Sequence, residues 1–164
     1  MATHVDYFLK IKGVDGESTD EKHKGEIELL SFSFGATNHV SIGSASGGAG
    51  AGRVAMSEFN FQKKIDKASA VLLQSCCTGA HFDTVTLTCR KAGKEQQQFL
   101  TIEFSTVFVS SVQYSGSAGS DVLPSDSVSL AFGKIKFEYK EQKPDGSLGG
   151  AIIGGWDLIK NVKV

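Results

Sequence analysis

Apolar and polar residues alternate in most segments of the chain, and this spacing of two is typical of β-strands with one buried face. The first such segment runs through Val5, Tyr7, Leu9 and Ile11. Further segments cover residues 26–34, 53–63, 84–89, 100–114 and 128–139, and a last short one lies around Trp156 and Leu158. The parity of the apolar positions changes near Ser57 and at Gly133, which predicts a bulge or bend at each. The pattern therefore predicts seven or so strands.

The segment 26–34 has two distinct faces. Leu30, Phe32 and Phe34 share one parity, and Ser31 and Ser33 take the other. Since successive strand side chains point to opposite faces, we expect the three large residues to face the core and both serines to face outward.

The spacing becomes helical between Asp66 and Gly79, which are placed as the N-cap and the C-terminal stop of one short helix. The core-facing stripe is predicted to contain Ala68, Val71, Leu72, Ser75 and Cys76. Leu73 and Cys77 lie outside this stripe, so the helix is expected to have a second apolar face. One helix among many long strands predicts a mainly β fold, a small antiparallel β-barrel that forms a single domain over residues 1–164.

Residues 35–52 are rich in glycine and carry little side-chain bulk, which predicts a long flexible loop. Gly47 and Gly52 have the spacing of a phosphate-binding loop. Arg53 and Val54 stand where that loop needs Lys and a hydroxyl, and a strand follows instead of a helix, so a phosphate site is disfavoured.

No catalytic, cofactor-binding or metal-binding constellation is predicted. The four histidines lie on separate segments, and Glu26 and Glu28, two apart, fit a solvated strand face. Cys76 and Cys77 fall in the last helical turn, where the helix dipole opposes a thiolate, and Cys89 has the apolar parity of its strand. All three thiols are therefore expected to be buried as small apolar groups, and the protein is not expected to be an enzyme.

Composition limits the classes of partner. The 17 basic and 18 acidic residues give a net charge of -1 and are mixed along the chain, so a polyanion such as nucleic acid is a poor candidate. Three cysteines do not form a disulfide framework and fit a reducing compartment. Charged residues interrupt the first 25 positions, and no apolar run is long enough for a membrane span. We therefore expect a protein made in the cytoplasm without membrane insertion.

Short strings distributed along the whole chain resemble the hemolysin-coregulated protein (Hcp) family of bacterial type VI secretion. They occur in the family's order with matching gaps, and the departures are small, such as the length of the glycine-rich loop. The strings are Asp6–Ile11, Lys12–Val14, Gly16–Ser18, Glu26–Gly35, Phe61–Ser69, Cys89–Gly93, Val109–Val112, Gln142–Gly146 and Gly155–Asp157.

The resemblance implies a structural subunit, six copies of which close into a ring with a wide channel. Such rings stack into the inner tube of a contractile machine, inside a sheath and beneath a spike protein, and they depend on a baseplate. The implied partners are further copies of this chain, these machine components and effector proteins bound within the ring. The resemblance also implies release to the medium or the target cell without a cleaved signal peptide.

On this basis the sequence suggests three sites. Ser31 and Ser33 are expected to line the channel and contact effectors, with an ordinary solvated strand face as the alternative, because parity fixes the face but not what it confronts. Leu73 and Cys77 are expected at the contact between subunits. The loop is expected to join stacked rings through Asn38, His39, Ser41, Gly47, Gly48, Gly50, Gly52 and Arg53. The main alternative is a small-ligand-binding β-barrel without catalysis, although eleven phenylalanines favour a filled interior.

Overall fold

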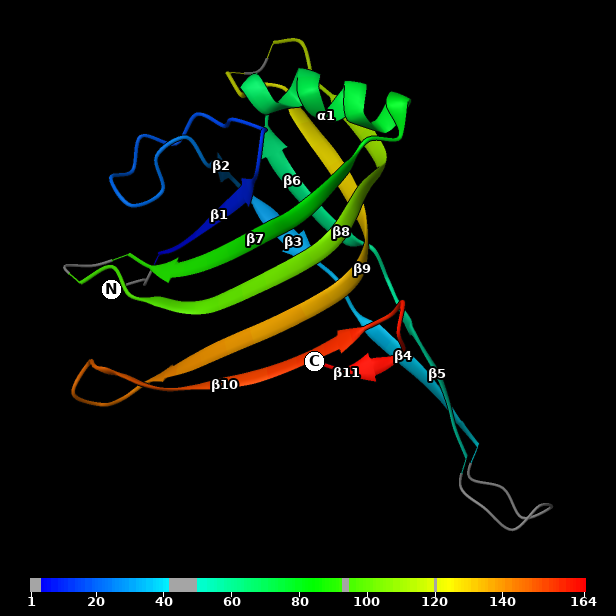
Figure 1. Cartoon of the computed structure of the whole chain (residues 1–164). Coiled ribbons are helices and arrows are strands. Elements are labelled where there is room, and N and C mark those ends of the chain that lie inside the picture. Colours follow the sequence, from blue (N-terminus) through cyan, green and yellow to red (C-terminus); the bar gives the residue numbers. More distant parts are fainter. Residues whose placement is uncertain (1–3, 42–49, 93–94, 120) are drawn as a thin grey trace.

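The computed structural model describes residues 4–41, 50–92, 95–119 and 121–164. Within them the protein is mainly β, with antiparallel strands and one helix, which confirms the predicted fold class (Figure 1). The elements are β1 (Val5–Ile11), β2 (Ile27–Glu28), β3 (Ser31–Ser33), β4 (Ala36–Ser41), β5 (Gly50–Met56), β6 (Phe59–Lys64), α1 (Lys67–Thr78), β7 (His81–Lys91), β8 (Gln98–Ser115), β9 (Ser125–Gln142), β10 (Leu148–Asp157) and β11 (Val162–Lys163).

The short strands β2 and β3 close the barrel. The strands follow the order β2-β1-β7-β8-β9, and β9 also pairs with β6, which pairs with β3. Between β2 and β3 the backbone N–H of Leu29 donates to Tyr7 of β1, and that of Leu30 donates to Gln62 of β6. This one segment therefore joins the two ends of the sheet.

Because the chain changes its pairing partner from β1 to β6 at this point, the prediction that Leu30 faces the core is wrong. Leu29 is buried, but Leu30 is 54% exposed and does not face the core. Ser31 is exposed as well, so two successive side chains point outward where the chain changes partner. The alternation then resumes, and Phe32 and Phe34 pack against the core as expected.

Aromatic rings fill the barrel. The Phe59 and Phe104 rings have centroids 4.7 Å apart, and Phe104 and Phe132 lie 4.8 Å apart. Phe59 and Phe104 are at most 1% exposed, so this part of the interior is packed and not a ligand cavity.

The strand β9 changes partner along its length. Its first half pairs with β6 up to Leu130, and from Lys134 onward it pairs with β10, with Gly133 between the two regions. Beyond Gly133 the sheet extends past the closed barrel, so Phe137 and Tyr139, which occupy apolar positions of the predicted segment 128–139, are 38% and 39% exposed. The last long strand, β10, begins well before Trp156 and is ten residues long.

The helix has the predicted ends. The Asp66 carboxylate accepts from the N–H of Ala68, and Gly79 adopts the left-handed conformation, φ 70°, that favours glycine after a helix. Leu72 is fully buried, but Val71, predicted on the core-facing stripe, is 39% exposed. Buried Lys63 lies beneath the first turn, with its Nζ 2.7 Å from Asp66 and 2.8 Å from Asp126.

The predicted loop 35–52 is partly a hairpin. β4 and β5 form a separate two-stranded sheet that projects from the barrel (Figure 1). The chain bends after β5 as predicted, because the Ser57 N–H donates to the Gly35 carbonyl and its hydroxyl accepts from the Gly35 N–H. Regular pairing was hidden in the sequence by the many glycines.

Candidate functional site

A face of neutral polar side chains covers one outer wall of the barrel, on β3, β6, β9 and β8. Residues paired across antiparallel strands point to the same face. One row runs through Ser31, Gln62, Ser127 and Gln113, and the next contains Ser33, Asn60, Ser129 and Ser111. We call these eight residues the polar face.

Exposure of the polar face agrees with strand parity. Ser31, Ser33, Gln62 and Gln113 are exposed, and the other four are half-buried. The Ser129 hydroxyl donates to Asn60 Oδ1, which links two strands across the face. The prediction that Ser31 and Ser33 point away from the core is confirmed, whereas what they face stays a prediction.

The sequence did not reveal the six other members of the polar face. Each has polar parity in its strand, but their assembly depends on the register among β6, β9 and β8. That register joins residues up to 69 positions apart, such as Asn60 and Ser129. Parity alone identified polar positions, not their shared surface.

The hairpin carries the residues predicted for ring stacking. Asn38, His39, Gly52 and Arg53 lie on β4 and β5 and are exposed, and the backbones of Ser41 and Gly50 pair across the hairpin. A Cβ at Gly52 would lie 2.6 Å from the carbonyl oxygen of His39, so this glycine permits the close approach of the two strands at an irregularity in their pairing. Gly47 and Gly48 lie outside the described residues.

The exposed side of α1 holds the residues predicted for the subunit contact. Leu73 is 44% exposed and Cys77 is exposed, so the expected burial of Cys77 within its own subunit is wrong. Cys76 is half-buried. Cys89 is buried as predicted, and burial raises the pKa of its thiol to about 12.

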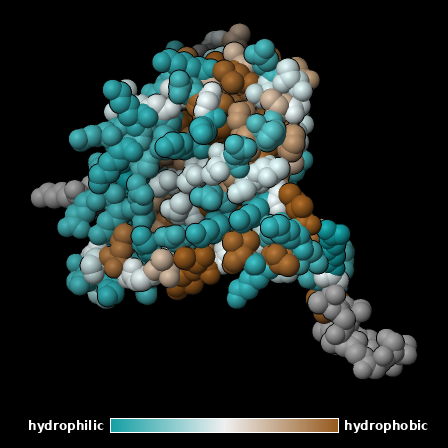
Figure 2. All heavy atoms as spheres, viewed as in Figure 1, coloured by the Kyte–Doolittle hydropathy of each residue, from teal (hydrophilic) through white to brown (hydrophobic). Residues whose placement is uncertain are grey.

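A second apolar area lies beyond the barrel. In the view of Figure 2, apolar side chains gather along the lower edge, over β10 and β11. Ile152 and Ile153 are 68% and 53% exposed, and Val162 and Val164 are also exposed. The structure therefore presents apolar surface at more than one place outside its core.

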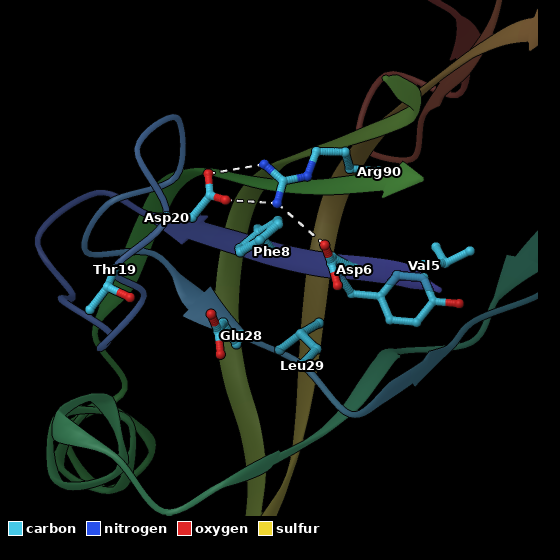
Figure 3. A pocket seen from close by; sticks show the side chains of 9 residues that line it. Val5, Asp6, Phe8, Thr19, Asp20, Glu28, Leu29 and Arg90 are labelled. Carbon is cyan, nitrogen blue, oxygen red and sulfur yellow. Dashed lines mark hydrogen bonds and ion pairs between the residues drawn. The ribbon is translucent and has the colours of Figure 1, made fainter. Parts of the chain in front are cut away.

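Buried Arg90 fixes the loop 12–26 against β1 and β7. Its guanidinium donates two hydrogen bonds to Asp20, at 2.9 and 2.7 Å, and one to Asp6 at 3.3 Å, above the ring of Phe8 (Figure 3). The hydrogen bonds from Arg90 lower the pKa of Asp20 to about 2, and Asp20 in turn raises the pKa of Arg90. Sequence spacing could not pair Arg90 with an aspartate 70 residues away.

The same loop also contains His23, which contacts Phe8. The imidazole stacks on Phe8 at 4.3 Å, and its Nδ1 lies 2.9 Å from a Glu26 carboxylate oxygen. Its Nε2 lies 3.0 Å from the amide nitrogen of Gln98. A cavity of about 340 Å³ beside Arg90 is lined by Asp6, Asp20, Glu28 and apolar neighbours. These contacts fasten the loop and bring together no nucleophile and base.

The described residues contain no group of three or more His, Cys, Asp or Glu side chains that could hold a metal ion. Nowhere in the described part of the chain is a helix both long and apolar enough to cross a bilayer.

Comparison with known proteins decides what kind of protein carries these surfaces. Residues 8–139 match the family described as "Type VI secretion system effector, Hcp". The chain belongs to the Hcp family. It is 41% identical to Protein hcp1 of Pseudomonas aeruginosa over 161 residues, which cover 97% of this chain and 98% of that protein.

Solved structures agree. A structure described as that of a type six secretion system protein has a TM-score of 0.93 and 36% identity, covering 98% of this Hcp chain and all of the other. The crystal structure of Hcp1 from Salmonella typhimurium has a TM-score of 0.82 and 34% identity, covering 98% and 99%. The predicted role as a type VI secretion tube protein of the ring-forming Hcp family is thereby confirmed, and the ligand-binding barrel is not supported.

Proposed function

We propose that the polar face lines the channel of a hexameric ring and contacts effector proteins there. The observation that carries this proposal is the continuity of eight neutral polar side chains over four adjacent strands. A wall of small hydroxyls and amides leaves the channel wide and offers donors and acceptors without a strong apolar or ionic grip. Ser31 and Ser33 lie at one edge of this wall.

The other surfaces fit the remaining contacts of a tube. The projecting β4–β5 hairpin joins one ring to the next through Asn38, His39 and Arg53, and the exposed residues Leu73 and Cys77 of α1 contact a neighbouring subunit. A ring of identical subunits needs unlike surfaces that meet head to tail, and a tube repeats such contacts along its axis.

The tube works with a spike protein, a sheath, a baseplate and effectors, and is released when the machine fires. In this role the chain transports and shelters other proteins and performs no catalysis. Support comes from membership of the Hcp family.

Substitution of Ser33 by tryptophan tests the channel assignment. Six indoles per ring would narrow the channel, so release of effectors to the medium should fall at least about tenfold while purified rings stay hexameric. The matched control is Lys10→Trp, at an exposed position of β1 on the opposite wall. Effector release and native mass spectrometry are the measurements, and unchanged release by the Ser33 variant would contradict the proposal.

A further inference from the structure

We infer that the polar face accepts effector proteins without regard to their net charge, through neutral hydrogen bonds, so that acidic and basic effectors are carried alike. The inference rests on the proposed function, because it requires the polar face to line the channel. It adds the chemistry of the partner: a protein surface recognised by hydrogen bonding with no ionic contribution from this wall.

All eight side chains of the polar face are serine, asparagine or glutamine, and none of them ionises. Each can both donate and accept, and a hydroxyl can rotate to suit its partner. Such groups can form hydrogen bonds with a carbonyl, an amide or a carboxylate of a cargo protein.

Charged residues of the same strands are turned away from this wall or lie at its border. Lys63 and Asp126 point into the protein, are at most 1% exposed, and lie 2.8 Å apart. Lys64 is exposed, but it pairs with Ser125 in the row at the border of the polar face. The ammonium and the carboxylate of the buried pair offset one another beneath the surface.

The wall opposite the polar face carries charged side chains, so the lack of charge is a property of the polar face and not of the whole barrel surface. There a single row of paired residues runs through Lys10, Thr86, Glu103 and Lys136. The strand β9 contributes to both walls: the outward-facing residues of its first half are neutral, whereas its second half contains Lys134 and Lys136. Charge is therefore distributed by wall and not by strand.

The lack of charge on the polar face has a larger effect in a ring, because the face is repeated six times. Any charge on the channel wall appears six times in a ring, and charges of one sign in a confined space repel cargo of the same sign. A neutral wall avoids that selection. Its contacts should also be insensitive to salt, because screening acts on charges and leaves neutral hydrogen bonds largely unchanged.

A pair of opposite charge variants tests the inference in the strain that carries this chain. Mass spectrometry identifies the proteins whose release to the medium requires this chain. It is applied to strains that produce wild type, Gln62→Lys or Gln62→Glu. We expect the lysine variant to lose basic effectors and the glutamate variant acidic ones, each by at least about tenfold, because like charges repel. Wild type should release both classes.

The controls place the same charges elsewhere. Thr84→Lys and Thr84→Glu introduce them on the wall opposite the polar face, where Thr84 is exposed, and should leave release unchanged. Native mass spectrometry confirms that every variant forms hexamers. Wild-type rings are also purified together with one of the released effectors. The amount of effector bound to these rings should change by no more than about twofold between 50 mM and 500 mM NaCl.

The outcomes separate this inference from the function on which it rests. If both charge variants release every effector as wild type does, the polar face does not meet cargo and the proposed function fails as well. If both lose effectors with no relation to effector charge, or if wild-type rings lose their cargo in salt, only charge-independent recognition is overturned.

Discussion

At the scale of single residues, the buried Arg90 pairs with two carboxylates. It binds Asp20 of the loop and Asp6 of β1, so one guanidinium joins segments that are far apart in the chain. Because the Arg90 side chain is only 4% exposed, its charge needs these carboxylates. The loop 12–26 is thus fastened to the barrel by a paired charge as well as by the packing of His23 on Phe8.

Substitution of Asp20 by asparagine should lower the melting temperature in a pH-dependent way. A free aspartate titrates near pH 3.9, whereas the folded pKa of Asp20 is lowered to about 2. Ionised Asp20 therefore stabilises the fold fully above the unfolded value, and this contribution is lost as the pH falls through the folded value. The melting temperatures of variant and wild type should converge between about pH 4 and pH 2.

Calorimetry from pH 7 to pH 2 measures this convergence. Asp15→Asn removes an exposed carboxylate from the same loop and serves as the control, with little expected change at any pH. A difference between Asp20→Asn and wild type that stays constant over the whole range would show that the charge of Asp20 beside Arg90 adds nothing to stability.

At the scale of elements, the hairpin β4–β5 stands apart from the barrel. It forms its own two-stranded sheet, and a two-stranded hairpin alone is at best marginally stable in water. Such an element gains order when a neighbouring surface covers it, which suits a contact between rings.

Replacing residues 39–53 by Asn-Gly should leave rings intact and weaken tubes. Asn38 and Val54 are paired in the hairpin, and Asn-Gly makes the tight turn that joins paired strands. Electron microscopy of negatively stained protein should show single rings and few stacks, whereas Thr37→Ala, at an exposed position of β4 outside the residues proposed for stacking, should stack nearly as wild type. Tubes of normal length from the shortened protein would refute a stacking role.

At the scale of the whole molecule, the described structure keeps apolar surface outside its core at several places, among them α1 and β10. A subunit in a closed ring needs two unlike surfaces, one for each neighbour. The helix surface includes Leu73 beside the exposed polar residue Gln74, which provides a matched pair for testing.

Substitution of Leu73 by glutamate should reduce the hexamer fraction, because a carboxylate would lose its water on entering an apolar contact. Gln74→Glu adds the same charge one residue further along and is expected to matter less. Native mass spectrometry at fixed subunit concentration compares the two, and Cys77 should react with a maleimide more slowly in hexamers than in separated subunits. Equal hexamer fractions for both variants would remove α1 from the proposed interface.

Local signals predicted local structure well. Asp66 and Gly79 marked the helix because capping depends on neighbouring residues, and parity placed Ser31 and Ser33 outside. Leu30 was misplaced because the chain changes partner strand there, and alternation contains no information about partners. The six other residues of the polar face and the contacts of Arg90 depend on register between distant segments, which a single sequence does not supply.

The closure of the barrel by β2 and β3 has a consequence for storage of the protein in the cell. Open sheet edges can recruit strands of other molecules and start uncontrolled aggregation. Here the segment from Ile27 to Ser33 pairs with the edges of both β1 and β6, whereas β11 covers only Trp156 and Asp157 of β10. Subunits that accumulate before assembly are therefore expected to form fibrils, where they form any, through the edge of β10 and not through β1 or β6.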